Sequence, residues 1–193
     1  MKMKAMVALF AVIFLLGACS QSEGNNEAGG DVEAQPVASE QPKSKSLLVT
    51  MQNAKGKNIG QARLTQMAQG VLISLEASDL KLGEHGFHIH ETGKCTPPDF
   101  ESAGGHFNPL NKKHGFDSPQ GPHAGDLPNI IVGKHGTVQT IQFTERVTLE
   151  KGKKHSLLDE DGSALVIHSK ADDYKSQPSG AAGERIACGE INN

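Results

Sequence analysis

The sequence lacks several features that would point to other classes of protein. Its 193 residues carry 19 Lys and Arg against 22 Asp and Glu, for a net charge of −3. This balance provides no excess of positive charge for binding nucleic acid. Beyond the N-terminus no apolar run is long enough to cross a membrane, and no segment of comparable length shows helical periodicity. These absences favour a β-rich domain that does not bind nucleic acid.

One short apolar run does occur, at the N-terminus. Two lysines precede Val7–Leu16, an arrangement typical of a signal peptide, and the run is too short for a membrane span. It leads into Leu16-Gly17-Ala18-Cys19, which resembles a bacterial lipobox. We expect residues 1–18 to be a signal peptide and Cys19 to carry lipid; the alternative is an ordinary signal peptide with an incidental cysteine. In both cases we expect export, and with lipid the protein is anchored to the cell envelope.

The segment after Cys19 is poor in apolar residues. Between Ser20 and Ser46 there is no Leu, Ile or aromatic residue. Such a segment cannot bury enough apolar surface to offset the entropy of ordering its chain. We therefore expect residues 19–46 to form a lipidated, flexible tether. The remaining residues, 47–193, have the length of one domain and can build a core without special help.

Cysteine is also scarce, with three residues in the chain. If Cys19 carries lipid, Cys95 and Cys188 remain, and two cysteines allow a single pairing. Disulfides persist outside the cytosol, so we expect that bond in an exported domain. A role for these cysteines in binding metal is the alternative.

Short runs with alternating polarity predict an all-β domain. In Val71–Ala77, for example, Val71, Ile73 and Leu75 share one face. We expect about eight strands, which by spacing form a sandwich or barrel. The segments assigned to strands are 46–52, 59–67, 71–77, 86–91, two strands within 129–143, 164–168 and 185–191.

Two segments break this pattern of strands and short turns. Thr92–Ala124 and Ser169–Glu184 show almost no strand or helix signal. Structureless loops of this length inside a compact domain are usually functional. The first loop carries a concentration of reactive side chains, namely Cys95, His106, His114 and His123. We therefore interpret both as functional loops.

The chain contains nine histidines, and their positions indicate a metal site. His88 and His90 share one face of a strand, since side chains two residues apart point the same way. Three others lie beside Gly or Lys and are interpreted as turn residues without a metal role: His85, His135 and His155. The remaining candidate ligands are His88, His90, His106, His114, His123, His168 and Asp126.

These seven candidates permit two arrangements. Imidazole suits zinc, copper, iron and nickel. Two four-coordinate sites need eight ligand positions, and one imidazole shared through its two nitrogens would supply the missing position. A single site with an open position is the alternative, and the count of ligands does not choose between them.

Several motifs in this region resemble the copper–zinc superoxide dismutase family. They are GFHIH at 86–90, GGHFNP at 104–109, HAGDLPN at 123–129, ALVIHSKADDY at 164–174 and GERIACG at 183–189. The resemblance covers Leu47–Ile191. It implies an eight-stranded Greek-key β-barrel, a flattened sandwich, with two long functional loops.

The resemblance also implies a role for each residue of the motifs. The copper ligands would be His88, His90, His106 and His168. The zinc ligands would be His106, His114, His123 and Asp126. Asp172 would link His88 to His114, and Cys95 would pair with Cys188. His106 and Arg185 would be the catalytic residues, His106 as the bridge that carries a proton and Arg185 as the guide for the anion.

The implied function is conversion of superoxide to oxygen and hydrogen peroxide by redox cycling of copper, outside the cytoplasm. A copper- and zinc-binding module without significant turnover is the alternative. One position and one loop depart from the family pattern. Glu190 stands where eukaryotic members place an apolar residue at their dimer contact, so we expect a monomer or a different dimer. The second loop has few charged guidance residues, and Lys170 is a second candidate cation.

Overall fold

The computed structural model describes residues 45–192; the predicted signal peptide, Cys19 and nearly all of the predicted tether lie outside the described residues. The described residues form nine strands and one short 3-10 helix. The strands are β1 Ser46–Asn53, β2 Asn58–Met67, β3 Gly70–Ala77, β4 Gly83–His85, β5 Phe87–His90, β6 Ile130–Val132, β7 Val138–Thr144, β8 Ser163–His168 and β9 Arg185–Ile191, and the helix is η1 Glu101–Ala103. Within 45–192 no helix is long and apolar enough to span a membrane.

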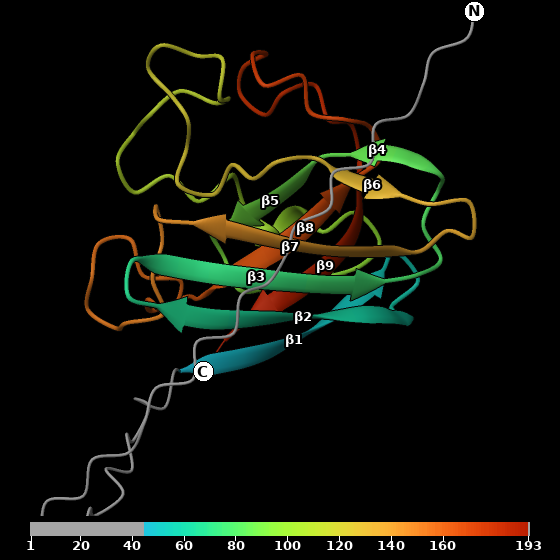
Figure 1. Ribbon diagram of the computed structural model, residues 1–193, viewed down its shortest axis with the longest axis horizontal. Helices are drawn as coiled ribbons and strands as arrows, with labels where there is room; N and C mark the ends of the chain where they lie inside the picture. Colours follow the sequence, from blue (N-terminus) through green and yellow to red (C-terminus); the bar gives the residue numbers. More distant parts are fainter. Residues whose placement is uncertain (1–44, 193) are drawn as a thin grey trace, which may run out of the picture. The chain divides into compact units, whose positions relative to one another are not determined.

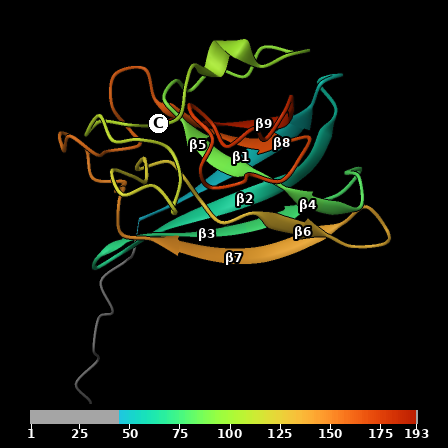
Figure 2. The ribbon, with the colours of Figure 1, turned by 90° about the horizontal axis from the view of Figure 1, so that it is seen from above.

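The strands form a curled antiparallel barrel. A seven-stranded sheet has the order β5-β8-β9-β1-β2-β3-β7, and β4 pairs with β6. Viewed from above, the sheet curls so that β5, β8 and β9 lie opposite β2, β3 and β7 (Figure 2). Only Gly86 separates β4 from β5, so the two count as one interrupted strand, which gives the predicted eight. The flattened β-barrel prediction is confirmed.

The connections between strands follow the Greek-key pattern. β3 is followed in the chain by β4, but its neighbour in the sheet is β7. β6 and β7 are joined by a tight turn in which the Gly133 amide donates to the Thr137 carbonyl at 2.9 Å. The last strand, β9, pairs with the first, β1 (Figure 1). This connectivity places β5 and β8 side by side, and both carry histidines.

The barrel interior is filled by aliphatic side chains. Val71, Ile73 and Leu75 of β3 are almost completely buried, as their alternation predicts. Each such side chain contributes roughly 1.5–3 kcal/mol by leaving water. On β5, Phe87 and Ile89 join the same core. His88 and His90 therefore point to the opposite face of that strand, where they are also buried.

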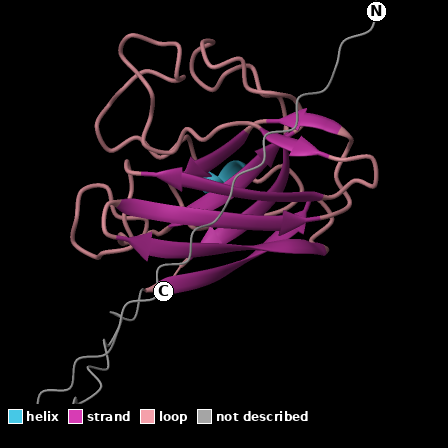
Figure 3. Ribbon diagram, in the orientation of Figure 1, coloured by secondary structure: helices cyan, strands magenta, loops and turns pink. Residues whose placement is uncertain are grey.

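Two long loops cover this second face. Residues 91–129 connect β5 to β6, and residues 169–184 connect β8 to β9. They lie side by side above the strands, drawn as the long loops in Figure 3. The His114 amide donates to Gln177 Oε1 at 3.0 Å, and Gln177 Nε2 donates back to the His114 carbonyl at 2.9 Å. The first loop ends later than predicted, at Asn129, because β6 begins at Ile130. It also contains η1, which is too short to show helical periodicity.

A disulfide ties the first loop to the barrel. The predicted bond between Cys95 and Cys188 is present, with the two Cα atoms 5.7 Å apart. It packs in a second buried cluster together with Phe100 of the loop. Glu190, two residues after Cys188, is exposed, and its Oε1 accepts a hydrogen bond from the Cys95 amide at 2.8 Å. The carboxylate at this position is therefore exposed and hydrogen-bonded.

One histidine does not lie where the sequence placed it. His135 and His155 lie in turns, but His85 is in β4 and is 2% exposed, so the prediction of a turn there is wrong. Its ring nitrogens lie 2.7 Å from the His168 carbonyl and 2.8 Å from the Lys81 carbonyl. The pattern of β4 was missed because three residues are too few to show alternation. His85 belongs to neither of the metal-ligand groups described below, so it has a structural role.

Candidate metal centre

Four histidines from two strands and a loop converge on one side of the barrel. His88 and His90 project from the same face of β5, and His168 ends the neighbouring strand β8. His106 lies in the first loop, directly opposite His90 in an isolated bridge. One ligand atom from each of these four lies within 4.8 Å of all the others, and all four side chains are buried.

The nitrogen atoms of this group are arranged for a cation. His88 Nδ1 and His106 Nε2 are buried without a hydrogen-bond partner. Nε2 of His90 lies 3.4 Å from Nε2 of His168. A set of inward-facing imidazole nitrogens without other acceptors or donors is costly unless a metal binds them. The four-nitrogen donor set therefore fits copper.

In each histidine on the strands, the ring nitrogen that points away from the group contacts a protein oxygen. His88 Nε2 lies 2.8 Å from Asp172 Oδ2, and His90 Nδ1 lies 3.0 Å from the Gly104 carbonyl. His168 Nδ1 lies 3.3 Å from the Gly183 carbonyl. Such contacts fix the ring orientation and the tautomer, so the other nitrogen is free to bind a metal.

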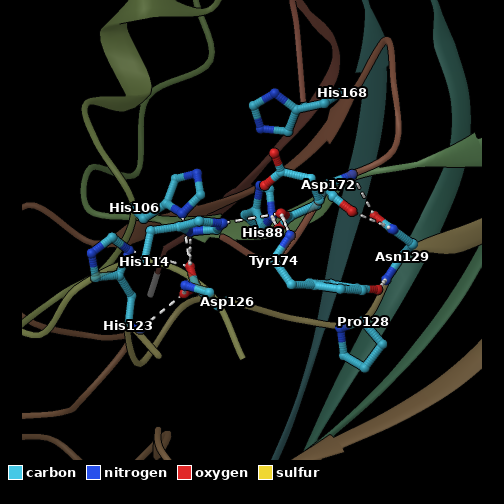
Figure 4. Close-up of polar contacts among 12 residues, drawn as sticks. His88, His106, His114, His123, Asp126, Pro128, Asn129, His168, Asp172 and Tyr174 are labelled. Atoms are coloured by element: carbon cyan, nitrogen blue, oxygen red, sulfur yellow. Dashed lines mark hydrogen bonds and ion pairs between the residues drawn. The ribbon is translucent and has the colours of Figure 1, made fainter. Parts of the chain in front are cut away.

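A second group surrounds the carboxylate of Asp126. Its Oδ1 lies 2.8 Å from His106 Nδ1, 3.1 Å from His114 Nδ1 and 3.2 Å from His123 Nδ1. Its Oδ2 accepts hydrogen bonds from the amides of Gly115 and His123, both at 2.9 Å. The backbone thus fixes one oxygen and directs the other at three imidazoles, as Figure 4 shows. Three nitrogens and one carboxylate oxygen fit tetrahedral zinc.

His106 belongs to both groups. Its Nδ1 faces Asp126, whereas its Nε2 faces the strand histidines and has no hydrogen-bond partner. Its ring centroid lies 4.1 Å from that of His88 and 5.5 Å from that of His123. Between the two arrangements that the ligand count left open, the geometry therefore favours two sites with a shared imidazole.

Asp172 connects the two groups from behind. It is 3% exposed, and its two oxygens lie 2.8 Å from His88 Nε2 and 3.0 Å from His114 Nε2. The Tyr174 amide donates to Oδ1 at 2.6 Å. Asn129 holds the backbone of Asp172: its Nδ2 donates to the Asp172 carbonyl and its Oδ1 accepts from the Asp172 amide, both at 2.9 Å (Figure 4).

The sequence did not reveal the supporting role of Asn129 and Tyr174. Both residues stand inside the motifs HAGDLPN and ALVIHSKADDY. The Tyr174 hydroxyl accepts a hydrogen bond from the Asn129 amide at 2.8 Å. An amide and a phenol carry no metal-ligand signal, so only the meeting of the two loops reveals that they support the centre.

The electrostatics of the centre keep several imidazoles neutral. Burial lowers the pKa of His106 to about 4 and that of His168 to about 3, and neighbouring histidines add to the effect. At His114 burial opposes the charged form, but the hydrogen bonds that the ring donates to Asp126 and Asp172 outweigh it and raise the pKa to about 9. The same contacts overcome burial at both carboxylates and hold the pKa of each well below its usual range. Both acids therefore stay ionised, which suits Asp126 as a metal ligand and Asp172 as a hydrogen-bond acceptor for two imidazoles.

Arg185, the predicted guide, is half-buried at the start of β9. Its Nη1 donates to the Phe100 carbonyl and its Nη2 to the Gly104 carbonyl, each at 2.6 Å. Gly104 also contacts His90, so the guanidinium is fixed next to the copper-type group. Lys170 lies in the second loop and is exposed.

The fold and the centre together define a class: a β-barrel protein with two adjoining groups of candidate metal ligands that have His106 in common. The family model described as copper/zinc superoxide dismutase matches residues 58–191. The chain therefore belongs to the copper/zinc superoxide dismutase family, and its cofactors are copper and zinc.

Relatives and solved structures agree with this assignment. The chain is 59% identical over 140 residues to superoxide dismutase [Cu-Zn] 1 of Aquifex aeolicus, covering 72% of this chain and 83% of that protein. It is 50% identical over 145 residues to a superoxide dismutase-like protein of Bacillus subtilis, covering 74% of each. A crystal structure of a double mutant of a SOD-like protein from B. subtilis matches with TM-score 0.74 and 51% identity, over 76% of this chain and 97% of that one. Cu/Zn superoxide dismutase from Brucella abortus matches with TM-score 0.63 and 28% identity, over 76% and 99%.

Proposed function

We propose that this protein is an extracytoplasmic superoxide dismutase in which His106 joins a copper site to a zinc site. His88, His90 and His168 complete the copper site, and His114, His123 and Asp126 complete the zinc site. The observation that carries this proposal is the orientation of His106, whose two nitrogens face the two ligand groups. The substrate is the superoxide anion.

Copper, when bound, supplies the one-electron oxidation and reduction by which two superoxide anions and two protons become oxygen and hydrogen peroxide. Zinc has no redox chemistry. The zinc-type group instead fixes the long loop: it draws His114, His123 and Asp126 together and so sets the position of His106. A loop of this length would otherwise present the imidazole in many orientations, at a cost in entropy.

The chain itself handles the proton and the charge. We assign His106 Nε2 as the atom that would hold a proton beside the substrate and give it up, and the same nitrogen would be a ligand of copper when copper is bound. This nitrogen is buried and has no other hydrogen-bond partner, so it is available for that role. Arg185 carries a permanent positive charge beside His90, and the chain as a whole is negative. That local charge attracts the anion and orients it toward the copper ligands.

The test compares two histidine variants loaded with copper and zinc. His106→Ala removes the shared imidazole, whereas His135→Ala removes an exposed histidine in the turn between β6 and β7. We expect the parent and His135→Ala to remove superoxide equally and His106→Ala to be slower by about 10²-fold or more, the contribution of a positioned acid–base group. Equal rates in all three would contradict the assignment. A parent that binds both metals but removes no superoxide would instead support the binding-module alternative.

The site of action is the second part of the proposal. We infer that Cys19 carries lipid and that the segment between Cys19 and Lys45 holds the domain away from the envelope; Ser46, which the sequence assigned to the tether, already pairs with Thr65 in the barrel. The disulfide supports an oxidising compartment. Changing Cys19 to Ser should abolish lipid labelling and release the protein from the membrane fraction. A chain beginning at Lys45 should remain soluble and fully active, since every proposed ligand lies after that residue. Lipid labelling that persists in Cys19→Ser would refute the anchor.

A further inference from the structure

Residues 103–107, which include His106, run antiparallel to β5 and to the two residues after it, Glu91 and Thr92. The Phe107 amide donates to the Ile89 carbonyl at 2.8 Å, and the Glu91 amide donates to the Gly105 carbonyl at 2.9 Å. One residue further, the Thr92 amide donates to the Ala103 carbonyl at 3.0 Å. These backbone bonds tie the segment to the strand that carries His88 and His90.

The ladder is interrupted at the peptide between Gly104 and Gly105. The Gly105 amide donates to the side-chain Oε1 of Glu91 at 2.9 Å. The carbonyl of the same peptide, on Gly104, accepts from Arg185 Nη2 at 2.6 Å and contacts His90 Nδ1 at 3.0 Å. Because a peptide is planar and trans, its N–H and C=O point in opposite directions. Bonds on both sides therefore fix its rotation.

Both residues that form this peptide are glycines, so side-chain sterics restrain its rotation very little. Gly104 has φ of +73°, and a Cβ there would lie 2.8 Å from Cγ and Oε1 of Glu91. The left-handed backbone at this position favours glycine, and a Cβ would press on the Glu91 side chain where it passes over the backbone. Glycine also rotates freely, so a Gly-Gly peptide without its partners would change orientation at little steric cost.

We infer that Glu91 is a positioning residue that locks the Gly104–Gly105 peptide. The lock keeps the Gly104 carbonyl aimed at His90 and Arg185 and keeps His106, the next residue, in register with His90. The prediction for turnover rests on the proposed function; the lock itself does not. An exposed carboxylate would ordinarily contribute little, but a hydrogen bond from an amide to an ionised oxygen is about twice as strong as a neutral one.

The first test uses the metal-free protein and needs no activity. Glu91→Ala removes the acceptor, and Glu91→Asp keeps the charge but is one methylene too short to reach. Glu101→Gln is the matched control: its exposed carboxylate acts on Arg185 through its charge and makes no side-chain bond to the Gly104–Gly105 peptide. We expect exchange of the Gly105 amide proton, followed by NMR, to be about tenfold faster or more in both Glu91 variants and unchanged in the control. Unchanged exchange in Glu91→Ala would overturn the inference.

The second test reads the copper site directly. In the copper- and zinc-loaded protein, Glu91→Ala and Glu91→Asp should shift the visible absorption and spin-resonance spectrum of copper, because His90 loses its fixed acceptor. Superoxide removal should fall several-fold in both Glu91 variants but should not fall in Glu101→Gln, which removes a negative charge near Arg185 without removing a bond to the peptide. If Glu91→Ala fails to fold, Glu91→Gln retains Oε1 and should show intermediate exchange; parent-like exchange there together with a parent-like spectrum would overturn the role of the charge. If the parent itself removes no superoxide, the proposed function fails, while the exchange and the spectrum still decide on the lock.

Discussion

Replacing Asp172 by Asn should weaken the copper site more than the zinc site. The carboxylate serves His88 through Oδ2 and His114 through Oδ1, at 2.8 and 3.0 Å. The Tyr174 amide also donates to Oδ1, at 2.6 Å, and needs an acceptor there. In Asp172→Asn the side-chain oxygen will therefore occupy the Oδ1 position, and the NH₂ group will face His88 Nε2. An NH₂ group cannot accept a hydrogen bond, so His88 alone loses its partner.

The magnitude follows from what is left unpaired. A buried N–H without an acceptor costs about 1–3 kcal/mol. Loss of a partner behind a metal ligand typically lowers metal affinity 10–100-fold, which is the same range of free energy. We therefore expect copper affinity to fall about 10–100-fold and zinc affinity to change by less than about threefold.

The assay is competition of the loaded protein with chelators, read separately for each metal. Asp173→Asn is the matched control, because the neighbouring carboxylate is exposed and bonds only to the nearby Lys175 and Ser176. It should retain both affinities. A loss confined to zinc, or an equal loss of both metals, would refute the reasoning about which oxygen the amide keeps.

Three further predictions follow from Arg185, the disulfide and the histidines. Arg185→Glu should retain the fold and both metals but slow superoxide removal about tenfold or more, and added salt should slow the parent while it slows the variant less or speeds it; rates at several ionic strengths test this, and matching salt slopes would point to another cation such as Lys170. Cys188→Ser should lower the melting temperature and copper retention, since the bond spans 93 positions and the chain-entropy model gives about 4–5 kcal/mol, with about 2–4 more usual in measurements; unchanged melting would count against it. The metal-free fold should be most stable near pH 6.5. His106 and His168 have pKa values lowered to about 4 and about 3, so as pH falls below 6.5 the unfolded chain binds protons that the folded chain does not, and the fold loses stability. His114 has a pKa raised to about 9, so as pH rises above 6.5 the folded chain keeps a proton that the unfolded chain has lost, and this contribution to stability declines. Urea midpoints across pH 4–9.5 test this, and a midpoint that rises steadily to pH 9 would contradict it.

The sequence was most informative where side-chain period and residue chemistry coincide. Alternation in Val71–Ala77 predicts the buried face of β3, and the spacing of His88 and His90 predicts their common face. Both follow from the geometry of a single strand, so no tertiary information is needed. The choice of a shared imidazole could not be made from the ligand count, because it depends on where the loop places His106 relative to β5 and on which nitrogen faces each group.

The supporting residues were the least predictable part of the centre. Asn129 acts through the backbone of Asp172, which lies 43 positions away, and Glu91 acts through the peptide between Gly104 and Gly105. These contacts form only when the long loops pack on each other and on β5. β4 was missed for a simpler reason: Gly86 separates three residues from β5, and a strand that short has no detectable period.

The measurement that tests the account most directly is superoxide removal by the zinc-loaded protein while copper is added stepwise. Residues 45–192 provide one group of four buried histidines for copper. We therefore predict a rate that rises in proportion to copper, stops rising at about one copper per chain, and remains when free copper is removed. A rate that does not rise, or that follows free copper without a break at that ratio, would contradict a copper–zinc superoxide dismutase built around His106.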